Sequence, residues 1–325
     1  MGIVKKYWGN LRRLRMLHVL FNIKNYGKLS QNKALYRRFG IKKSVVASLA
    51  HKDIQKSGEE VPWMDQQPSK EDILIKLRKT NIPQHLHQAV LDWPENGYLI
   101  IPGAFAAEFC DRISRELEQS IENNLVDFDY TNSRVMNAWK ACPAIRSAAS
   151  DQTVLEVLTF ILGKKVLPFQ TISFLKGSRQ KTHSDFIHMT TEPVGYLIAS
   201  WLALEDIQPG SGALHYYPGS HRLPYIFGEH FPHSSNAVSV GDDLYGNYEN
   251  KIAEVIQVNK LKKEIFYPKK GDLLIWHANL LHGGEPVTDS SLSRKSLVTH
   301  YFCQDNILCY HEITQRPAVM NDIIQ

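Results

Sequence analysis

Short strand-like runs separated by turn residues dominate the chain after residue 164. Runs of this kind, with no helices between them, are typical of a sandwich or jelly roll rather than a parallel sheet. The seven runs span residues 166–175, 182–189, 196–204, 212–217, 253–258, 271–277 and 295–303. We therefore expect a mainly β domain with flanking helices.

A His-x-Asp pair lies inside one of these runs. Side chains two residues apart on a strand share a face, so His183 and Asp185 would point the same way. An imidazole and a carboxylate are two of the three ligands of a 2-His-1-carboxylate iron site. The third ligand should be a downstream histidine, either His277 or His282, which cannot both face inward from one regular strand. The Leu-Leu-His-Gly-Gly context favours His282.

Composition indicates an ordinary soluble protein. The chain has 325 residues, enough for one large domain or two small ones, and 43% of them are hydrophobic. Its cysteines are Cys110, Cys142, Cys303 and Cys309, without any Cys-x-x-Cys pair. This pattern favours reduced thiols, and hence a cytoplasmic location, over a disulfide framework.

Residues 1–52 form a basic arm. They hold thirteen Lys and Arg and no acidic residue, whereas the rest of the chain has 25 basic and 33 acidic residues. A narrow apolar stripe at helical spacing consists of Leu11, Leu14, His18 and Phe21. The apolar run 16–21 is too short to span a bilayer, which takes about 20 residues, and no signal-peptide cleavage site follows it.

Three roles for this arm stay open. It is a helical extension packed on the main domain, a peripheral contact to an anionic membrane, or a polyanion-binding segment. Nucleic acid is the least supported partner, because the chain has no aromatic RNA-binding motif and no zinc finger. The sequence makes no prediction about the oligomeric state.

The expected domain boundaries follow from these changes in charge and in secondary-structure pattern along the chain. We expect a basic helical arm and linker over residues 1–60 and a helical lead-in over 61–95. The catalytic domain would span residues 96–310, and a tail would span 311–325. Residues 224–252 are long, aromatic and rich in Gly and Asn, so they are either a lid over the site or an exposed insertion.

Five segments resemble the phytanoyl-CoA dioxygenase family of iron(II)/2-oxoglutarate-dependent oxygenases. They include the opening strand Gly-Tyr-Leu-Ile-Ile-Pro-Gly, the His-Ser-Asp-Phe metal motif and the Pro-Gly-Ser-His-Arg turn. In order, the segments are residues 97–103, 183–186, 201–222, 271–283 and 294–296. The resemblance implies a double-stranded β-helix, a cupin-like jelly roll, with the basic arm outside it.

The resemblance also implies the ligands and cofactors. His183, Asp185 and His282 would be the catalytic residues that hold Fe(2+), while 2-oxoglutarate and O2 fill the open positions. Arg294 would grip the distal carboxylate of 2-oxoglutarate with its planar fork. Trp201 and, less directly, Gln170 match co-substrate-binding positions. In some members a serine follows the distal histidine by two residues, but Gly284 occupies that position in this chain.

The implied reaction is hydroxylation of an aliphatic C–H bond in a small or lipid-like substrate, with release of succinate and CO2. Asp185 occupies the position that family halogenases leave open for chloride, which argues against halogenation. Two alternatives remain open. One is desaturation, cyclisation or epimerisation at the same site. The other is a non-catalytic jelly roll that binds a membrane or a polyanion.

The remaining histidines and aspartates have less specific roles. We expect His221, Asp206 and Asp272 to stabilise turns. His215 and His300 should be interior histidines with satisfied hydrogen bonds. His188 either lines the substrate pocket or is an ordinary strand residue.

Overall fold

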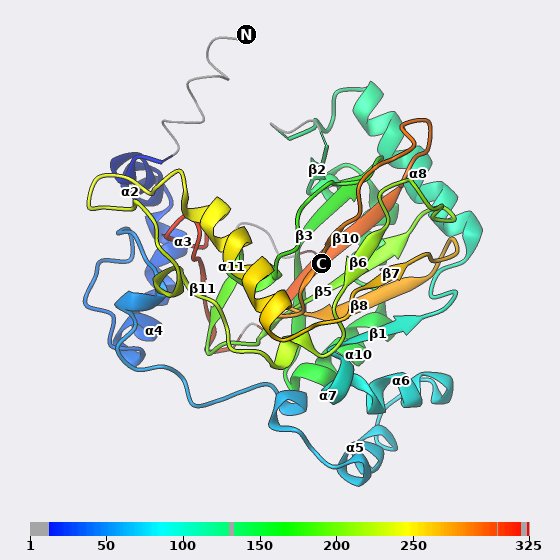
Figure 1. The fold of residues 1–325 in the computed structure, drawn as a ribbon, viewed down its shortest axis with the longest axis horizontal. Helices are drawn as coiled ribbons and strands as arrows, with labels where there is room; N and C mark the ends of the chain where they lie inside the picture. Colours follow the sequence, from blue (N-terminus) through cyan, green and yellow to red (C-terminus); the bar gives the residue numbers. More distant parts are fainter. Residues whose placement is uncertain (1–12, 130–132, 304, 320–323, 325) are drawn as a thin grey trace.

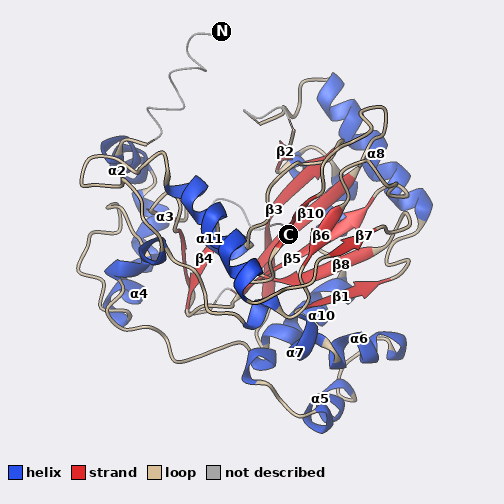
Figure 2. Cartoon of the chain, viewed as in Figure 1, coloured by secondary structure: helices blue, strands red, loops and turns tan. Residues whose placement is uncertain are grey.

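The computed structural model describes residues 13–129, 133–303, 305–319 and 324, and its sheets are flanked by helices on the outside (Figures 1 and 2). The strands are β1 (Tyr98–Ile101), β2 (Val135–Met136), β3 (Val166–Phe174), β4 (Thr190–Glu192), β5 (Leu197–Ala203), β6 (Leu214–Tyr216), β7 (Glu264–Phe266), β8 (Leu273–His277), β9 (His282–Gly284), β10 (Ser296–Cys303), β11 (Leu308–His311) and β12 (Arg316–Pro317). The α-helices are α2 (Arg15–Lys24), α3 (Tyr26–Leu29), α4 (Lys33–Arg38), α5 (Lys70–Leu77), α6 (His87–Leu91), α7 (Trp93–Asn96), α8 (Ala107–Glu122), α9 (Pro143–Ala149), α10 (Gln152–Leu162) and α11 (Leu244–Val258).

The largest sheet has six antiparallel strands in the order β1-β8-β5-β10-β3-β2. Every residue of the central strand β5 is buried, so this strand has a packed layer on each face. Trp201 packs toward the second sheet, whereas Leu202 packs in the cluster that contains α8 and α10. On the neighbouring strand β10, Val298 continues the first layer and Leu297 the second.

A three-stranded sheet, β7-β6-β9, closes the sandwich. Leu214 and Phe266 from this sheet share one hydrophobic cluster with Trp201, Leu274 and Val298 of the large sheet. The expected jelly roll is therefore confirmed. The third sheet, β12-β11-β4, lies on the side of the N-terminal helices (Figure 1).

Two of the expected strands are wrong. Residues 182–189 contain one isolated bridge and a 3-10 turn instead of a strand. Residues 253–258 form the end of helix α11. The buried residues Leu244, Tyr248 and Ile252 recur every four positions, which is a helical period that the short window at 253–258 did not include.

Residues 244–252 of the expected loop therefore belong to helix α11. Tyr248 and Ile252 of this helix pack in a buried cluster with Ile187 and Leu281, which neighbour the ligand candidates in sequence. Helix α11 is thus a fixed cover over the region of the metal motif, and not an exposed insertion.

The described part of the basic arm contains helices α2, α3 and α4, and its second half is packed on the main domain. Leu29, Tyr36 and Phe39 form a buried cluster with Leu308 and Tyr310 of β11. Helix α2 differs, because among its residues only His18 and Asn22 are buried. In the predicted stripe, Leu11 lies outside the described residues and Phe21 is 49% exposed.

None of the helices in the described part of the chain is long and apolar enough to cross a bilayer.

Candidate metal centre and co-substrate pocket

His183 and His282 are held side by side by backbone pairing. They form an isolated antiparallel bridge, in which each backbone N–H donates to the carbonyl oxygen of the other residue at 2.9 Å. Directly paired residues project their side chains to the same face. The two imidazole centroids are accordingly 4.5 Å apart. This bridge therefore aligns the two histidine side chains, a role that was expected of a full strand over residues 182–189.

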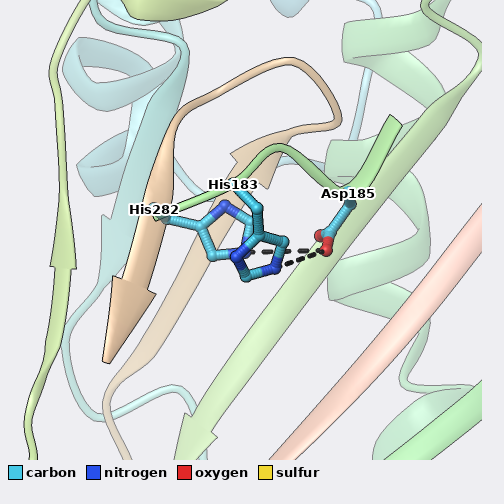
Figure 3. A group of neighbouring side chains, drawn as sticks. All are labelled: His183, Asp185 and His282. Carbon is cyan, nitrogen blue, oxygen red and sulfur yellow. Dashed lines mark ion pairs between the residues drawn. The ribbon is translucent and has the colours of Figure 1, made fainter. Parts of the chain in front are cut away.

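Asp185 completes a group of three ligand candidates (Figure 3). It opens the 3-10 turn Asp185–Ile187, which carries its carboxylate toward the two histidines. Its Oδ1 lies 3.7 Å from His183 Nε2 and 3.6 Å from His282 Nε2. One ligand atom from each residue lies within 4.8 Å of the others, and all three residues are buried. An ion at the centre of this triangle would contact all three.

The hydrogen bonds of the two imidazoles fix which nitrogen faces the centre. His183 Nδ1 donates to the Lys181 carbonyl oxygen at 2.8 Å, and His282 Nδ1 donates to the Leu280 carbonyl oxygen at 2.9 Å. With Nδ1 protonated, each Nε2 keeps its lone pair, which is the arrangement usual for metal-binding histidines. Burial also lowers the pKa of His183 well below its ordinary value, so this imidazole is neutral at neutral pH.

The Asp185 carboxylate remains charged in this environment. Burial alone would raise its pKa, but the neighbouring His282, His300 and His183 together lower it below the ordinary value. Trp276 Nε1 donates to Oδ2 at 2.8 Å and leaves Oδ1 as the oxygen that faces the histidines. Two imidazole nitrogens and one carboxylate oxygen are a donor set that fits ferrous iron, and no cysteine lines the cavity.

His300 was expected to be a satisfied interior histidine, and this is wrong. Its Nε2 lies 3.4 Å from Asp185 Oδ2, and neither ring nitrogen has a hydrogen-bond partner among the described residues. His300 reaches the site through its position on β10, opposite Gln170 of β3. Sequence spacing carries no signal for His300 or Trp276, since both reach the site through strand register.

Arg294 is a buried cation beside the metal centre. It precedes β10, and its guanidinium carbon lies 5.1 Å from the Phe174 ring centroid and 5.7 Å from that of Trp201. Only 2% of Arg294 is exposed, and burial lowers its pKa to about 10, so it stays charged at neutral pH. No carboxylate of the described residues lies within ion-pair distance, because nearby Glu205 accepts from Lys295 N and Ser293 Oγ. The buried Nε of Arg294 has no hydrogen-bond partner among the described residues.

The other two co-substrate candidates differ from each other. Trp201 lines the cavity that contains Asp185 and Arg294. Gln170 lies on β3, and the residues from this strand that line the cavity are Ile172 and Phe174. The structure therefore brings Trp201, and not Gln170, to the pocket.

Ser178 supplies a hydroxyl close to the position where family members carry a serine. A Cβ atom built on Gly284 would lie 2.8 Å from Ser178 Oγ. Ser178 also lines the cavity. A hydroxyl from the loop after β3 thus lies close to position 284, and only the folded structure reveals this proximity.

His277, the alternative ligand, is turned away from the centre. Its Nε2 lies 3.1 Å from Asp65 Oδ2, and its Nδ1 accepts from Asn279 N at 3.0 Å. His221 packs against it at 5.4 Å between ring centroids. His277 therefore attaches the lead-in segment to β8.

The remaining predictions have mixed outcomes. Asp272 accepts from Gly103 N and Lys269 N, and Asp206 accepts from Lys270 N, as expected of turn residues. His215 is an interior histidine with a polar neighbour at each ring nitrogen: Thr182 Oγ1 lies 2.8 Å from Nε2, and Glu285 Oε1 lies 2.8 Å from Nδ1. His188 packs 5.7 Å from His183 and 5.2 Å from Tyr245, between ring centroids, and does not line the cavity.

A second arginine, Arg134, lines the cavity and was not predicted. Its Nη2 donates to Gln180 Oε1 at 2.9 Å. Gln180 Nε2 in turn lies 3.0 Å from His183 Nε2 and 3.4 Å from the Tyr245 hydroxyl. Arg134 stands 49 positions before His183, so nothing in the spacing of the motif points to it.

Comparisons with known proteins agree with this site. Residues 93–296 match the family model described as phytanoyl-CoA dioxygenase (PhyH). No curated protein sequence gives a significant match.

Several solved structures share the fold at low identity. The 2-oxoglutarate-dependent carbocyclase SnoK from nogalamycin biosynthesis is 17% identical, with 72% of this chain and 88% of that chain covered and a TM-score of 0.55. The epimerase SnoN from the same biosynthesis is 17% identical, with coverages of 68% and 83% and a TM-score of 0.52. EctD from S. alaskensis with 2-oxoglutarate and 5-hydroxyectoine is also 17% identical, with coverages of 72% and 85% and a TM-score of 0.52.

The family match spans more than half of the chain and contains His183, Asp185, His282 and Arg294. The chain belongs to the phytanoyl-CoA dioxygenase family, and it is an iron- and 2-oxoglutarate-dependent dioxygenase.

Proposed function

We propose that His183, Asp185 and His282 hold the iron. The observation that carries this proposal is the convergence of two histidine lone pairs and one carboxylate oxygen within 4.8 Å. Three protein ligands on one side leave the other coordination positions open for co-substrate and oxygen. With iron and 2-oxoglutarate bound, O2 would be the oxidant: one oxygen atom would enter succinate as 2-oxoglutarate loses CO2, and the other would oxidise the substrate.

Arg294 binds the distal carboxylate of 2-oxoglutarate in this account. The guanidinium offers a planar fork that matches a carboxylate. Phe174 and Trp201 flank it and keep water away from the ion pair. Ser178 donates a further hydrogen bond, because its hydroxyl lines the same cavity.

The reaction we favour is hydroxylation of an aliphatic C–H bond in a small substrate. Asp185 fills the position that a halide would need, which argues against halogenation. Cyclisation and epimerisation are alternatives at the same site, since a carbocyclase and an epimerase share the fold. A non-catalytic binding role is disfavoured, because it requires neither three converging ligands nor a buried unpaired arginine.

Anaerobic titration with ferrous iron and then 2-oxoglutarate tests this function. We expect one iron per chain and a visible charge-transfer band that forms only when both are present. Oxygen and a panel of small molecules are then added, and succinate is measured. Absence of the band at saturating iron and 2-oxoglutarate would contradict the proposed site.

Helix α2 favours a peripheral membrane contact in a cytoplasmic enzyme. Its large hydrophobic side chains are exposed to solvent, namely Met16 (68%), Leu17 (37%), Leu20 (55%), Phe21 (49%) and Ile23 (54%). This patch, which we call the α2 apolar face, belongs to an arm with thirteen basic and no acidic residues. Exposed apolar side chains combined with positive charge suit an anionic lipid surface. Such docking would bring the enzyme close to a lipid-like substrate.

A further inference from the structure

The cavity beside the metal centre contains two arginines, and 2-oxoglutarate accounts for only one. Arg294 and Arg134 both line it, and both guanidinium groups lie near the Phe174 ring, at 5.1 and 6.0 Å from its centroid. In the proposed function, the two charges of 2-oxoglutarate and the one of Asp185 balance ferrous iron and Arg294. The charge of Arg134 is then left without a counterion.

Nothing in the described part of the chain neutralises Arg134. No carboxylate of the described residues lies within ion-pair distance of its guanidinium, and its buried Nε has no hydrogen-bond partner. Within the described part of the chain, the Arg134 side chain makes one hydrogen bond, which goes to the neutral amide of Gln180. A buried donor without an acceptor is costly, and an oxyanion bound in the cavity would supply the missing acceptor.

The backbone holds Arg134 in place at the cavity wall. It directly precedes β2, whose Val135 is fully buried and pairs with Ser173 of β3. Its carbonyl oxygen accepts from Asp129 N at 2.8 Å. Arg134 is therefore attached to the same strand that contributes Ile172 and Phe174 to the cavity.

Gln180 links Arg134 to the open side of the metal centre. Its amide nitrogen lies 3.0 Å from His183 Nε2, the atom that faces the iron position, and 3.4 Å from Tyr245 of α11. Gln180 and His183 both line the cavity, so this amide lies beside the metal position. Arg134 is only half-buried, whereas Arg294 is 2% exposed, so Arg134 is the arginine that an incoming molecule meets first.

We propose that Arg134, with Gln180, is the recognition site for an oxyanion on the substrate, either a carboxylate or a phosphate group. This inference rests on the proposed function, because it assigns Arg294 to 2-oxoglutarate. The guanidinium fork can bind such a group in bidentate fashion, and its Nε gains the missing acceptor. Substrate specificity is then for anionic molecules, and neutral analogues bind poorly.

Anion binding to the anaerobic complex with iron and 2-oxoglutarate tests this proposal. The probes are acetate, methyl phosphate and the neutral acetamide, each titrated while the charge-transfer band is followed. We expect one or both anions to perturb the band, and acetamide to have no effect at the same concentrations. The anion that binds more tightly identifies the chemical class. If no probe perturbs the band, or if acetamide acts like acetate, the proposal is wrong.

Variants assign the effect to Arg134. In Arg134→Gln we expect anion binding to weaken about tenfold or more, while 2-oxoglutarate binding changes less than about twofold. Lys176→Gln, an exposed cation on the same loop as Gln180, is the matched control and should behave like the wild type. Equal anion binding in Arg134→Gln, or a large loss of 2-oxoglutarate binding, overturns the assignment. Failure of the band to form in the wild type instead contradicts the metal site.

Discussion

At the scale of single residues, the site depends on groups that orient the ligands. The backbone carbonyl groups of Lys181 and Leu280 fix the histidine tautomers, and Trp276 occupies one carboxylate oxygen of Asp185. The three ligand candidates could be picked out from motif spacing, and the structure brings them together. These orienting contacts could not, because they depend on loop geometry and strand register.

Trp276→Phe tests whether orientation matters. Phenylalanine keeps the aromatic packing but removes the N–H that donates to Asp185 Oδ2. We expect iron affinity to fall about tenfold or more, as is typical when an outer hydrogen bond to a metal ligand is lost. Equilibrium dialysis with ferrous iron measures this. Trp139→Phe is the control, because no described residue accepts from that buried indole N–H and Trp139 does not line the cavity.

Arg294→Lys separates co-substrate binding from metal binding. Lysine keeps the charge but loses the bidentate fork, so we expect 2-oxoglutarate affinity to fall by about 10- to 100-fold with little change in iron affinity. Anaerobic titration of the charge-transfer band gives both constants. Lys295→Gln, whose ammonium pairs with Glu118 at 2.6 Å, should retain normal co-substrate binding. If Lys295→Gln weakens 2-oxoglutarate binding and Arg294→Lys does not, Lys295 is the residue that binds the distal carboxylate.

At the scale of secondary-structure elements, prediction from the sequence succeeded for the long strands. The strand-like runs at 166–175, 196–204 and 295–303 correspond to β3, β5 and β10. It failed at 182–189, where a single bridge with His282 replaces a strand. Tertiary pairing decides the conformation there, and the local sequence does not.

Helix α2 provides an element-scale prediction. Phe21→Glu combined with Leu20→Glu places two negative charges on the α2 apolar face without touching the buried His18 or Asn22. We expect the variant to lose binding to anionic vesicles while keeping succinate formation, since the new carboxylates are repelled by anionic lipid and the apolar contact with the bilayer is lost. Co-sedimentation at low and high salt measures this.

The matched control for α2 is Ile75→Glu, which places a charge on an exposed apolar residue of α5. It should bind vesicles like the wild type. Equal sedimentation of all three proteins with anionic and neutral vesicles would mean that the arm is a structural extension only.

At the scale of the whole molecule, burial keeps several histidines neutral. Burial lowers the pKa of His215 and His188 to about 4 and that of His221 to about 3. In the unfolded chain the pKa of each of these histidines is about 6.5, so below that pH the unfolded state binds more protons than the folded state. Stability of the metal-free protein is therefore complete above about pH 6.5 and declines as pH falls toward 4.

Thermal unfolding of the metal-free protein between pH 7.5 and 5 checks this prediction. We expect the Tm to fall steadily below about pH 6.5. Replacement of the exposed His85 by Gln should leave the profile unchanged, since its environment resembles water. A Tm that rises on acidification would mean that these histidines gain protons in the folded protein.

Iron stoichiometry in Asp185→Ala tests the central claim most directly. The carboxylate is the one charged ligand of the proposed centre, and its removal deletes both an oxygen donor and the negative charge that balances the metal. The comparison is with the wild type and with Asp206→Ala, which removes a carboxylate from a surface turn. After anaerobic dialysis against ferrous iron, we expect one iron per chain in the wild type and Asp206→Ala, and none retained in Asp185→Ala. Full iron occupancy in a folded Asp185→Ala would contradict the assignment of His183, Asp185 and His282 as the iron site.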